Sequence, residues 1–197
     1  MVDHPLAIAG VSRPCSGETA NGDTWTVEWH GGTCRIAVID GLGHGPAAAL
    51  AAQRACDLLR AHPALAPGDA LRACHDALGG TRGAVISIAC IDLETRQLIY
   101  AGIGNVEAQV WQSGRTQRLM AYRGIVGVTL PTPRPVVCAL ERDWLLLLHT
   151  DGVSARFNVE SLPEVTSPTP KLLAAAVLEG WGRDTDDATV VVARPRS

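Results

Sequence analysis

The sequence has little charge of either sign and no long apolar run. Asp, Glu, Lys and Arg together make up 19% of its 197 residues, and the formal net charge is −3. This balance, without any run of Lys or Arg, argues against a nucleic-acid-binding surface. No stretch approaches the ~20 uninterrupted apolar residues that a membrane span requires.

Other features typical of disordered or exported chains are also missing. Because 47% of the residues are apolar and the net charge is low, the composition excludes disorder. The segment Met1–Pro5 carries an acid early and lacks the basic and then apolar layout of a signal peptide. We therefore expect one soluble, cytoplasmic domain over residues 1–197, with neither nucleic acid nor membrane as a partner.

Paired cysteine motifs are absent as well. The six cysteines form no CxxC pair and lie mostly inside apolar runs. In a chain that is not secreted, such cysteines are small buried hydrophobic residues, and a zinc site would need closely spaced ligand pairs. The cysteines predicted to be free are Cys15, Cys34, Cys56, Cys74, Cys90 and Cys138.

Short apolar runs rich in β-branched residues predict strands with both faces covered. The runs are Ile36–Ile39, Val85–Ile91, Leu145–Leu148 and Val190–Ala193. This pattern alone also suits a parallel α/β sheet. The connections favour antiparallel sheets, because short turns at Gly31-Gly32, Leu93–Arg96 and Ser113-Gly114 separate neighbouring strand-like segments.

Three segments are predicted to be helices. Pro46–Ala61 places polar residues on one stripe and alanines and leucines on the other. Asp69–Leu78 stops before Gly79, a frequent helix terminator. The third begins at Thr169-Pro170, an N-cap followed by proline at the first helical position, and runs to Gly180. Together with the strands, these helices predict a layered α+β domain of stacked sheets flanked by helices.

Acidic residues stand at the mouths of the predicted strands. Asp23 precedes one strand-like segment and Asp186-Asp187 precede another. Asp40 and Asp151 end apolar strands beside glycine turns. If these strand ends converge, several carboxylates share a small space, where like charges repel unless a cation neutralises them. Oxygen ligands of this kind select Mg²⁺ or Mn²⁺ over zinc. The alternative is that each aspartate only caps a strand or turn.

The acidic motifs and several intermediate segments also occur in a distinctive order. The motifs are Gly22-Asp23, Asp40–Gly45, Thr150–Gly152 and Asp186–Thr189, and the intermediate segments are Arg82–Ala84, Gly104–Val106 and His149–Gly152. This set resembles the metal-dependent serine/threonine phosphatases of the PP2C type, in their bacterial SpoIIE branch. The intermediate segments are similar to those of small single-domain members from the stressosome pathway. The resemblance covers about residues 15–194.

The resemblance implies a PP2C-like fold, a four-layer α-β-β-α sandwich of two antiparallel sheets flanked by helices. It also implies two bound ions, Mn²⁺ or Mg²⁺, with Asp40 as the bridging ligand. Asp23 and the carbonyl of Gly41 would complete one ion site, and glycine suits that position because its backbone can approach an ion closely. Asp151 and Asp186 would complete the other. A metal-bound water of lowered pKa would then attack phosphorus without a protein nucleophile.

The substrate class follows from the resemblance alone, because fold and site do not fix a substrate. It implies phosphorylated STAS-domain regulatory proteins of a stressosome or partner-switching pathway, and a monomeric enzyme. Two other functions stay open. A binding module could use the same fold to sequester a regulatory partner, although the chain keeps all four predicted metal-binding aspartates, which favours the enzyme. A phosphatase that acts on a small metabolite is the third possibility.

The sequence departs from the larger eukaryotic members at one point. Their histidine directly after the bridging Asp-Gly is replaced here by Leu42, and His44 follows two residues later. His44 is a candidate to protonate the leaving group or orient substrate; the alternative is an exposed turn residue. Arg13 is the nearest match to a phosphate-binding arginine near the start of those members. His149 is expected to form structural hydrogen bonds.

Overall fold

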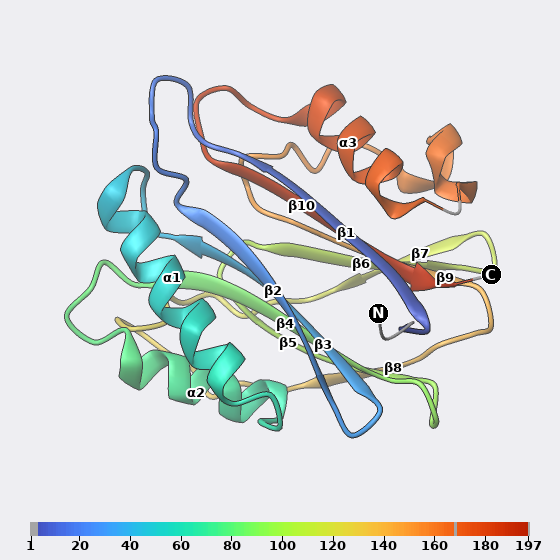
Figure 1. The fold of residues 1–197 in the computed structure, drawn as a ribbon, viewed down its shortest axis with the longest axis horizontal. Coiled ribbons are helices and arrows are strands. Elements are labelled where there is room, and N and C mark those ends of the chain that lie inside the picture. The colour runs from blue at the N-terminus through green and yellow to red at the C-terminus, as the bar shows by residue number, and fades with distance from the viewer. Residues whose placement is uncertain (1–3, 168, 197) are drawn as a thin grey trace.

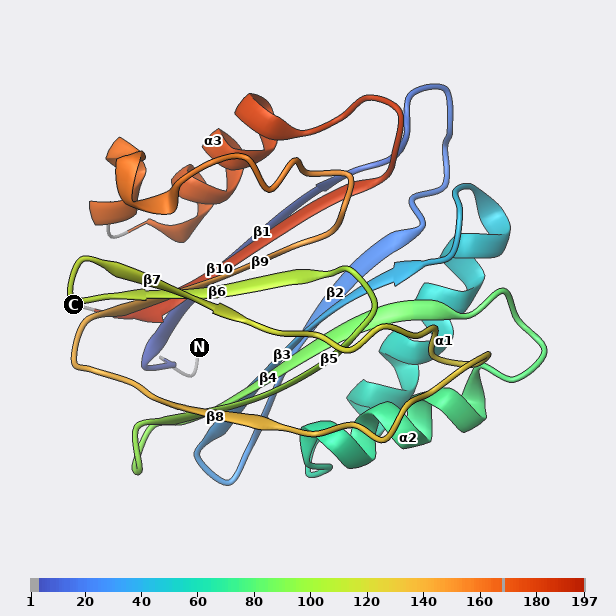
Figure 2. The ribbon, with the colours of Figure 1, turned by 180° about the vertical axis from the view of Figure 1, so that it is seen from behind.

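Two antiparallel sheets packed face to face form the centre of the molecule (Figure 1). A computed structural model describes residues 4–167 and 169–196. Helices α1 (Pro46–Ala61) and α2 (Pro67–Ala77) cover the outer face of one sheet, and α3 (Pro170–Trp181) covers that of the other. Figure 2 shows the same four layers from behind. The predicted α-β-β-α sandwich is confirmed.

Each sheet has five strands within the described residues. The first contains β1 (Leu6–Arg13), β6 (Glu107–Gln112), β7 (Arg115–Leu119), β9 (Trp144–His149) and β10 (Ala188–Pro195), in the order β1-β10-β9-β6-β7. The second contains β2 (Asp23–His30), β3 (Thr33–Gly41), β4 (Ala84–Asp92), β5 (Gln97–Ile103) and β8 (Val136–Ala139), in the order β2-β3-β4-β5-β8. Two 3₁₀ turns, Val159–Ser161 and Pro163–Thr166, precede α3.

The predicted hairpin turns lie where the sequence places them. Gly31-Gly32 joins β2 to β3, Leu93–Arg96 joins β4 to β5, and Ser113-Gly114 joins β6 to β7. Gly31 and Gly32 have φ angles of 54° and 85°, the left-handed conformation that two-residue hairpin loops require.

The helix boundaries differ slightly from those predicted. α1 has the predicted limits, whereas α2 begins at Pro67 instead of Asp69 because proline is well accommodated in the first turn of a helix. α3 continues to Trp181. Thr169 occupies the N-cap position of α3 as predicted, but its side chain makes no capping hydrogen bond, so the preorganised φ of Pro170 is what favours the helix start.

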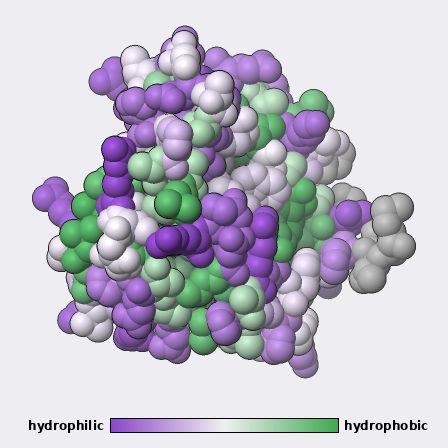
Figure 3. Space-filling view, turned by 60° about the vertical axis from the view of Figure 1, so that its left-hand side comes forward, coloured by the Kyte–Doolittle hydropathy of each residue, from purple (hydrophilic) through white to green (hydrophobic). Residues whose placement is uncertain are grey.

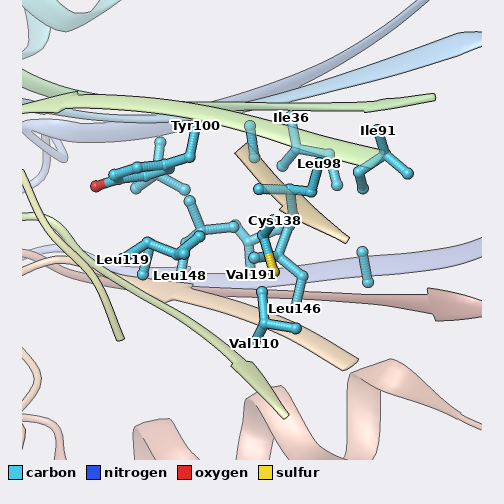
Figure 4. Packing of buried hydrophobic residues seen from close by; sticks show 14 of the residues in the cluster. Ile36, Ile91, Leu98, Tyr100, Val110, Leu119, Cys138, Leu146, Leu148 and Val191 are labelled. Atoms are coloured by element: carbon cyan, nitrogen blue, oxygen red, sulfur yellow. The ribbon is translucent and has the colours of Figure 1, made fainter. Parts of the chain in front are cut away.

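Apolar side chains fill the space between the sheets and the spaces under the helices. Figure 4 shows Ile36, Leu98 and Tyr100 of the second sheet facing Leu146 and Val191 of the first. Because every strand in the middle of a sheet is covered on both faces, its apolar residues occur on consecutive positions. All six cysteines are free; five are buried and Cys15 is half-buried, as predicted. No helix in the described ranges is long and apolar enough to cross a bilayer.

A buried ion pair fastens the C-terminal end of α1 to the second sheet. The side chains of Arg35 (β3) and Glu28 (β2) are 1% and 8% exposed, and the Arg35 Nε donates to a Glu28 carboxylate oxygen at 3.1 Å. The guanidinium also donates to the backbone carbonyls of His62, at 2.9 Å, and Leu59. A cation at this end also interacts favourably with the helix dipole. The C-terminal end of α1 is therefore firmly held, whereas its first residue comes directly after the turn that follows β3.

We expect Arg35→Leu to lower the free energy of unfolding by about 3–5 kcal/mol, since it leaves the charge of the buried Glu28 carboxylate without its cationic partner. Urea denaturation followed by circular dichroism measures this loss. The matched control is Arg72→Leu, which breaks an exposed pair with Asp69 and should cost at most about 1 kcal/mol. Equal losses in the two variants would contradict the structural role of the buried pair.

Candidate metal centre

The structure brings the four predicted aspartates to one end of the sandwich, the end at which α1 begins (Figure 1). Asp23, the first residue of β2, lies directly opposite Asp40 in the β2–β3 register. Asp151 follows β9 and Asp186 precedes β10, so these two come from the other sheet. Asp23, Asp151 and Asp186 all interact electrostatically with Asp40. The face turned forward in Figure 3 mixes hydrophilic and hydrophobic residues.

Thr150 ties the two sheets together at this end. Its hydroxyl donates to Asp23 Oδ2 at 2.7 Å and accepts the backbone N–H of Thr189 at 2.9 Å. Its own N–H donates to the carbonyl of Thr189 at 3.1 Å. The position of Asp23 in one sheet is thereby fixed relative to Asp151, the next residue along from Thr150.

Asp187 belongs to the framework of the site. It is only 2% exposed, and its carboxylate accepts the backbone N–H groups of Cys15 and Gly22, both at 2.9 Å. These bonds hold the loop that leads from β1 into β2 and places Asp23. The neighbouring Asp186 is more exposed and accepts the N–H of Asp187 at 2.9 Å. Asp187 thus adds a fifth carboxylate without being available as a free ligand.

Crowding and burial oppose ionisation of these carboxyls. Burial, followed by repulsion from Asp23, Asp151, Asp186 and Asp187, raises the pKa of Asp40 to about 9. Burial raises the pKa of Asp23 to about 7 although Thr150 donates to it. The pKa of Asp186 is also raised, by burial and then by Asp151. A cation among these groups would offset the repulsion.

The donor set fits a hard divalent cation. Asp23 Oδ1 is buried and has no hydrogen-bond partner in the described part of the chain, so one carboxylate oxygen is left for a ligand. Oxygen donors of this kind suit Mg²⁺ or Mn²⁺. Within residues 4–167 and 169–196, however, no three His, Cys, Asp or Glu side chains form a ready-made ion-binding group. Backbone carbonyl and water ligands would therefore complete any site, as Mg²⁺ commonly requires.

Close packing requires glycine at position 41, independently of the expected approach of its backbone to an ion. A Cβ there would lie 2.1 Å from the carbonyl oxygen of Ala48, so a side chain would push α1 away from the end of β3. Gly152 is equivalent on the other sheet, where a Cβ would lie 1.9 Å from the carbonyl oxygen of Asp187. The close approach of loop backbones therefore requires glycine at both positions.

The remaining candidates lie around the rim. His44 is 58% exposed at its side chain and its Nδ1 lies 2.9 Å from Glu18 Oε1. Arg13 pairs with Asp184 at 3.1 Å and is thus already engaged. His149 is buried and bonds through Nδ1 to the carbonyl of Thr150 at 2.9 Å, in keeping with a structural role; burial lowers its pKa. Asn105 was not a predicted site residue, yet its Nδ2 donates to Asp151 Oδ2 at 2.6 Å.

One Cys-x5-Arg spacing, from Cys90 to Arg96, is of the kind that cysteine-dependent phosphatases use. The structure argues against that chemistry here. Cys90 lies inside β4, and burial raises the pKa of its thiol to about 11, so no thiolate nucleophile is available. Arg96 lies in the turn that joins β4 to β5.

The family described as Stage II sporulation protein E (SpoIIE) matches residues 30–196. The chain belongs to the SpoIIE family. Its sequence is 26% identical to the phosphoserine phosphatase RsbX of Bacillus subtilis (strain 168) over 139 residues, which is 70% of each chain.

Solved structures share this fold. One described as "The bacterial stressosome: a modular system that has been adapted to control secondary messenger signaling" is 29% identical, with a TM-score of 0.89 over 97% of this chain and all of that one. RsbX in complex with magnesium is 21% identical, with a TM-score of 0.86 over 96% and 95%. The predicted enzyme class, a phosphatase with the PP2C fold, is confirmed.

Proposed function

We propose that this SpoIIE-family chain is a metal-dependent serine/threonine protein phosphatase. Its substrates would be phosphorylated regulatory proteins of the STAS class, and it would act as a cytoplasmic monomer. The similarity to the phosphoserine phosphatase RsbX supports the reaction, and the similarity to a chain of a stressosome structure supports a regulatory setting. The STAS class itself rests on the resemblance of the motifs.

The observation that carries this proposal is the crowded carboxylate cluster with a buried, unpartnered oxygen on Asp23. Such a cluster is unfavourable without a cation, and a purely structural role would leave the repulsion uncompensated. We assign two ions, Mn²⁺ or Mg²⁺, to this place. The proposed ligands are Asp23, Asp40, Asp151, Asp186 and the carbonyl of Gly41.

When bound, the ions would polarise the phosphoryl oxygens and supply a water of lowered pKa. The chain's own residues position the groups around them. Thr150 orients Asp23, and Asn105 orients Asp151. His44, held at Nδ1 by Glu18, is the candidate that would donate a proton from Nε2 to the leaving serine oxygen.

The substrate assignment is tested with a STAS-domain protein phosphorylated on serine, incubated with the enzyme and Mn²⁺. We expect its intact mass to fall by one phosphate group, while the same protein phosphorylated on tyrosine stays unchanged. Stable binding of the phosphoprotein without loss of phosphate would instead identify a binding module. Hydrolysis of small phosphomonoesters but of neither phosphoprotein would contradict the protein substrate.

A further inference from the structure

The segment Arg82–Ala84 resembles the family motifs, but the proposed ion ligands leave it unused. Its backbone is fixed beside the turn that follows β3. The Gly83 N–H donates to the Thr81 hydroxyl at 3.0 Å, and the Gly83 carbonyl accepts the N–H of Leu42 at 3.0 Å. Ala84 lies opposite Gly41 in the β3–β4 register. The Arg82 side chain therefore starts from a rigid point next to the carboxylate cluster.

The guanidinium of Arg82 lies against this same turn. Its Nη1 is 3.1 Å from the position that a Cβ on Gly43 would take, and Gly43 has a φ of 87° that favours glycine. A Cβ on Gly22 would in turn lie 3.3 Å from the Gly43 carbonyl oxygen and 2.6 Å from Asp187 Oδ2. The guanidinium therefore lies close to Gly43, Gly43 lies close to Gly22, and Gly22 contacts the carboxylate of Asp187.

Arg82 is nevertheless unpaired among the residues that the structure describes. Its side chain is exposed, and it forms neither a hydrogen bond nor an ion pair with any other residue that the structure describes. Arg13, which the sequence suggested for phosphate binding, is by contrast paired with Asp184. A cation that lies against the turn after β3 and pairs with no carboxylate among the described residues is available to an anion from outside.

We infer that Arg82 binds the phosphate group of the substrate, an inference that rests on the proposed phosphatase function. A guanidinium presents planar N–H donors that match two phosphate oxygens, which an ammonium group cannot reproduce. The carboxylates repel a phosphate dianion, so a positive charge beside this turn favours its entry. Arg82 contacts the phosphate before and during reaction, so it contributes mainly to binding.

The test compares Arg82→Ala and Arg82→Lys with the wild type and with Arg115→Ala. Arg115 is an exposed arginine at the start of β7, beside the β6–β7 hairpin, so its loss controls for the change in net charge. Two quantities are measured in Mn²⁺. One is the dissociation constant of inorganic phosphate by calorimetry, and the other is kcat and KM for an aryl phosphate.

For Arg82→Ala we expect the phosphate dissociation constant and KM to rise by about 10- to 100-fold, the loss of a charge-assisted bidentate contact. The value of kcat should change much less. Arg82→Lys should recover part of the affinity. Arg115→Ala should have the wild-type dissociation constant, kcat and KM. The melting temperatures of all variants should equal that of the wild type.

Unchanged phosphate affinity in Arg82→Ala, or equal losses in Arg82→Ala and Arg115→Ala, would overturn the inference. A different result would refute the proposed function, namely a wild type that hydrolyses no phosphate ester. If that wild type still bound inorganic phosphate through Arg82, the phosphate site would stand while the proposed function failed.

Discussion

Asp40→Asn is expected to abolish phosphatase activity while leaving the fold intact. The proposed bridging carboxylate would supply ligands to both ions, and loss of their charge stabilisation would remove several kcal/mol of transition-state stabilisation. This corresponds to a fall in kcat/KM of about 10³-fold or more. Steady-state hydrolysis of an aryl phosphate in Mn²⁺ measures the loss, and near-ultraviolet circular dichroism checks the fold. Wild-type turnover in this variant would contradict the assignment of Asp40.

The same variant should be more stable than the wild type when both are free of metal. The folded-state pKa of Asp40 is about 9, well above the ordinary value of about 3.9 for an unfolded aspartate. The folded carboxyl therefore holds its proton more tightly, so its contribution to stability is present at low pH and is lost as the pH rises from about 4 to about 9. Asparagine removes this dependence.

Urea denaturation in chelator at pH 5 and pH 8 detects the difference, which should be larger at pH 8. Asp76→Asn is the matched control, because Asp76 is an exposed aspartate on α2 and is not one of the charges that raise the pKa of Asp40. The opposite result would be a metal-free wild type with the same free energy of unfolding at pH 5 and pH 8, equal to that of Asp40→Asn at both. This result would show that the carboxylates do not repel one another in the folded protein.

Removal of divalent cations has the second large expected effect. EDTA should reduce aryl-phosphate hydrolysis to the uncatalysed background, because the pKa of each of the six cysteine thiols is raised and no thiolate nucleophile is available to replace the ions among the described residues. Mn²⁺ should restore activity better than Zn²⁺, since the donors are oxygen atoms.

Added Mn²⁺ should also raise the melting temperature at pH 8. At a hundredfold excess over its dissociation constant, a bound ligand increases the free energy of unfolding by about 2.7 kcal/mol. EDTA saturated with Mn²⁺ beforehand controls for effects of the chelator itself. Full activity in excess free EDTA would exclude a role for the ions.

Local sequence patterns were sufficient to predict the layered fold. The hairpin turns at Gly31-Gly32 and Ser113-Gly114 require antiparallel neighbours, and the consecutive apolar residues of Ile36–Ile39 require cover on both faces. The start of α2 at Pro67 was missed because a helix boundary depends on the local backbone, which a pattern of apolar residues does not define.

The site was only partly predictable, because its parts meet through long-range contacts. Asp23 and Asp40 follow from adjacent strands joined by a hairpin, so their proximity is nearly local. Thr150, which links Asp23 to Thr189 across the two sheets, depends on how the sheets pack, and no sequence spacing encodes that distance. The anchoring role of Asp187 was missed for the same reason, since its partners lie more than a hundred residues away.

Calorimetric titration of Mn²⁺ into the metal-free wild type and into Asp40→Asn tests the carboxylate cluster as a two-ion centre most directly. We predict that the wild type binds two ions per chain and that the asparagine variant loses tight binding of both, because Asp40 is their proposed shared ligand. Unchanged stoichiometry and affinity in Asp40→Asn, or no binding by the wild type, would contradict the proposed centre.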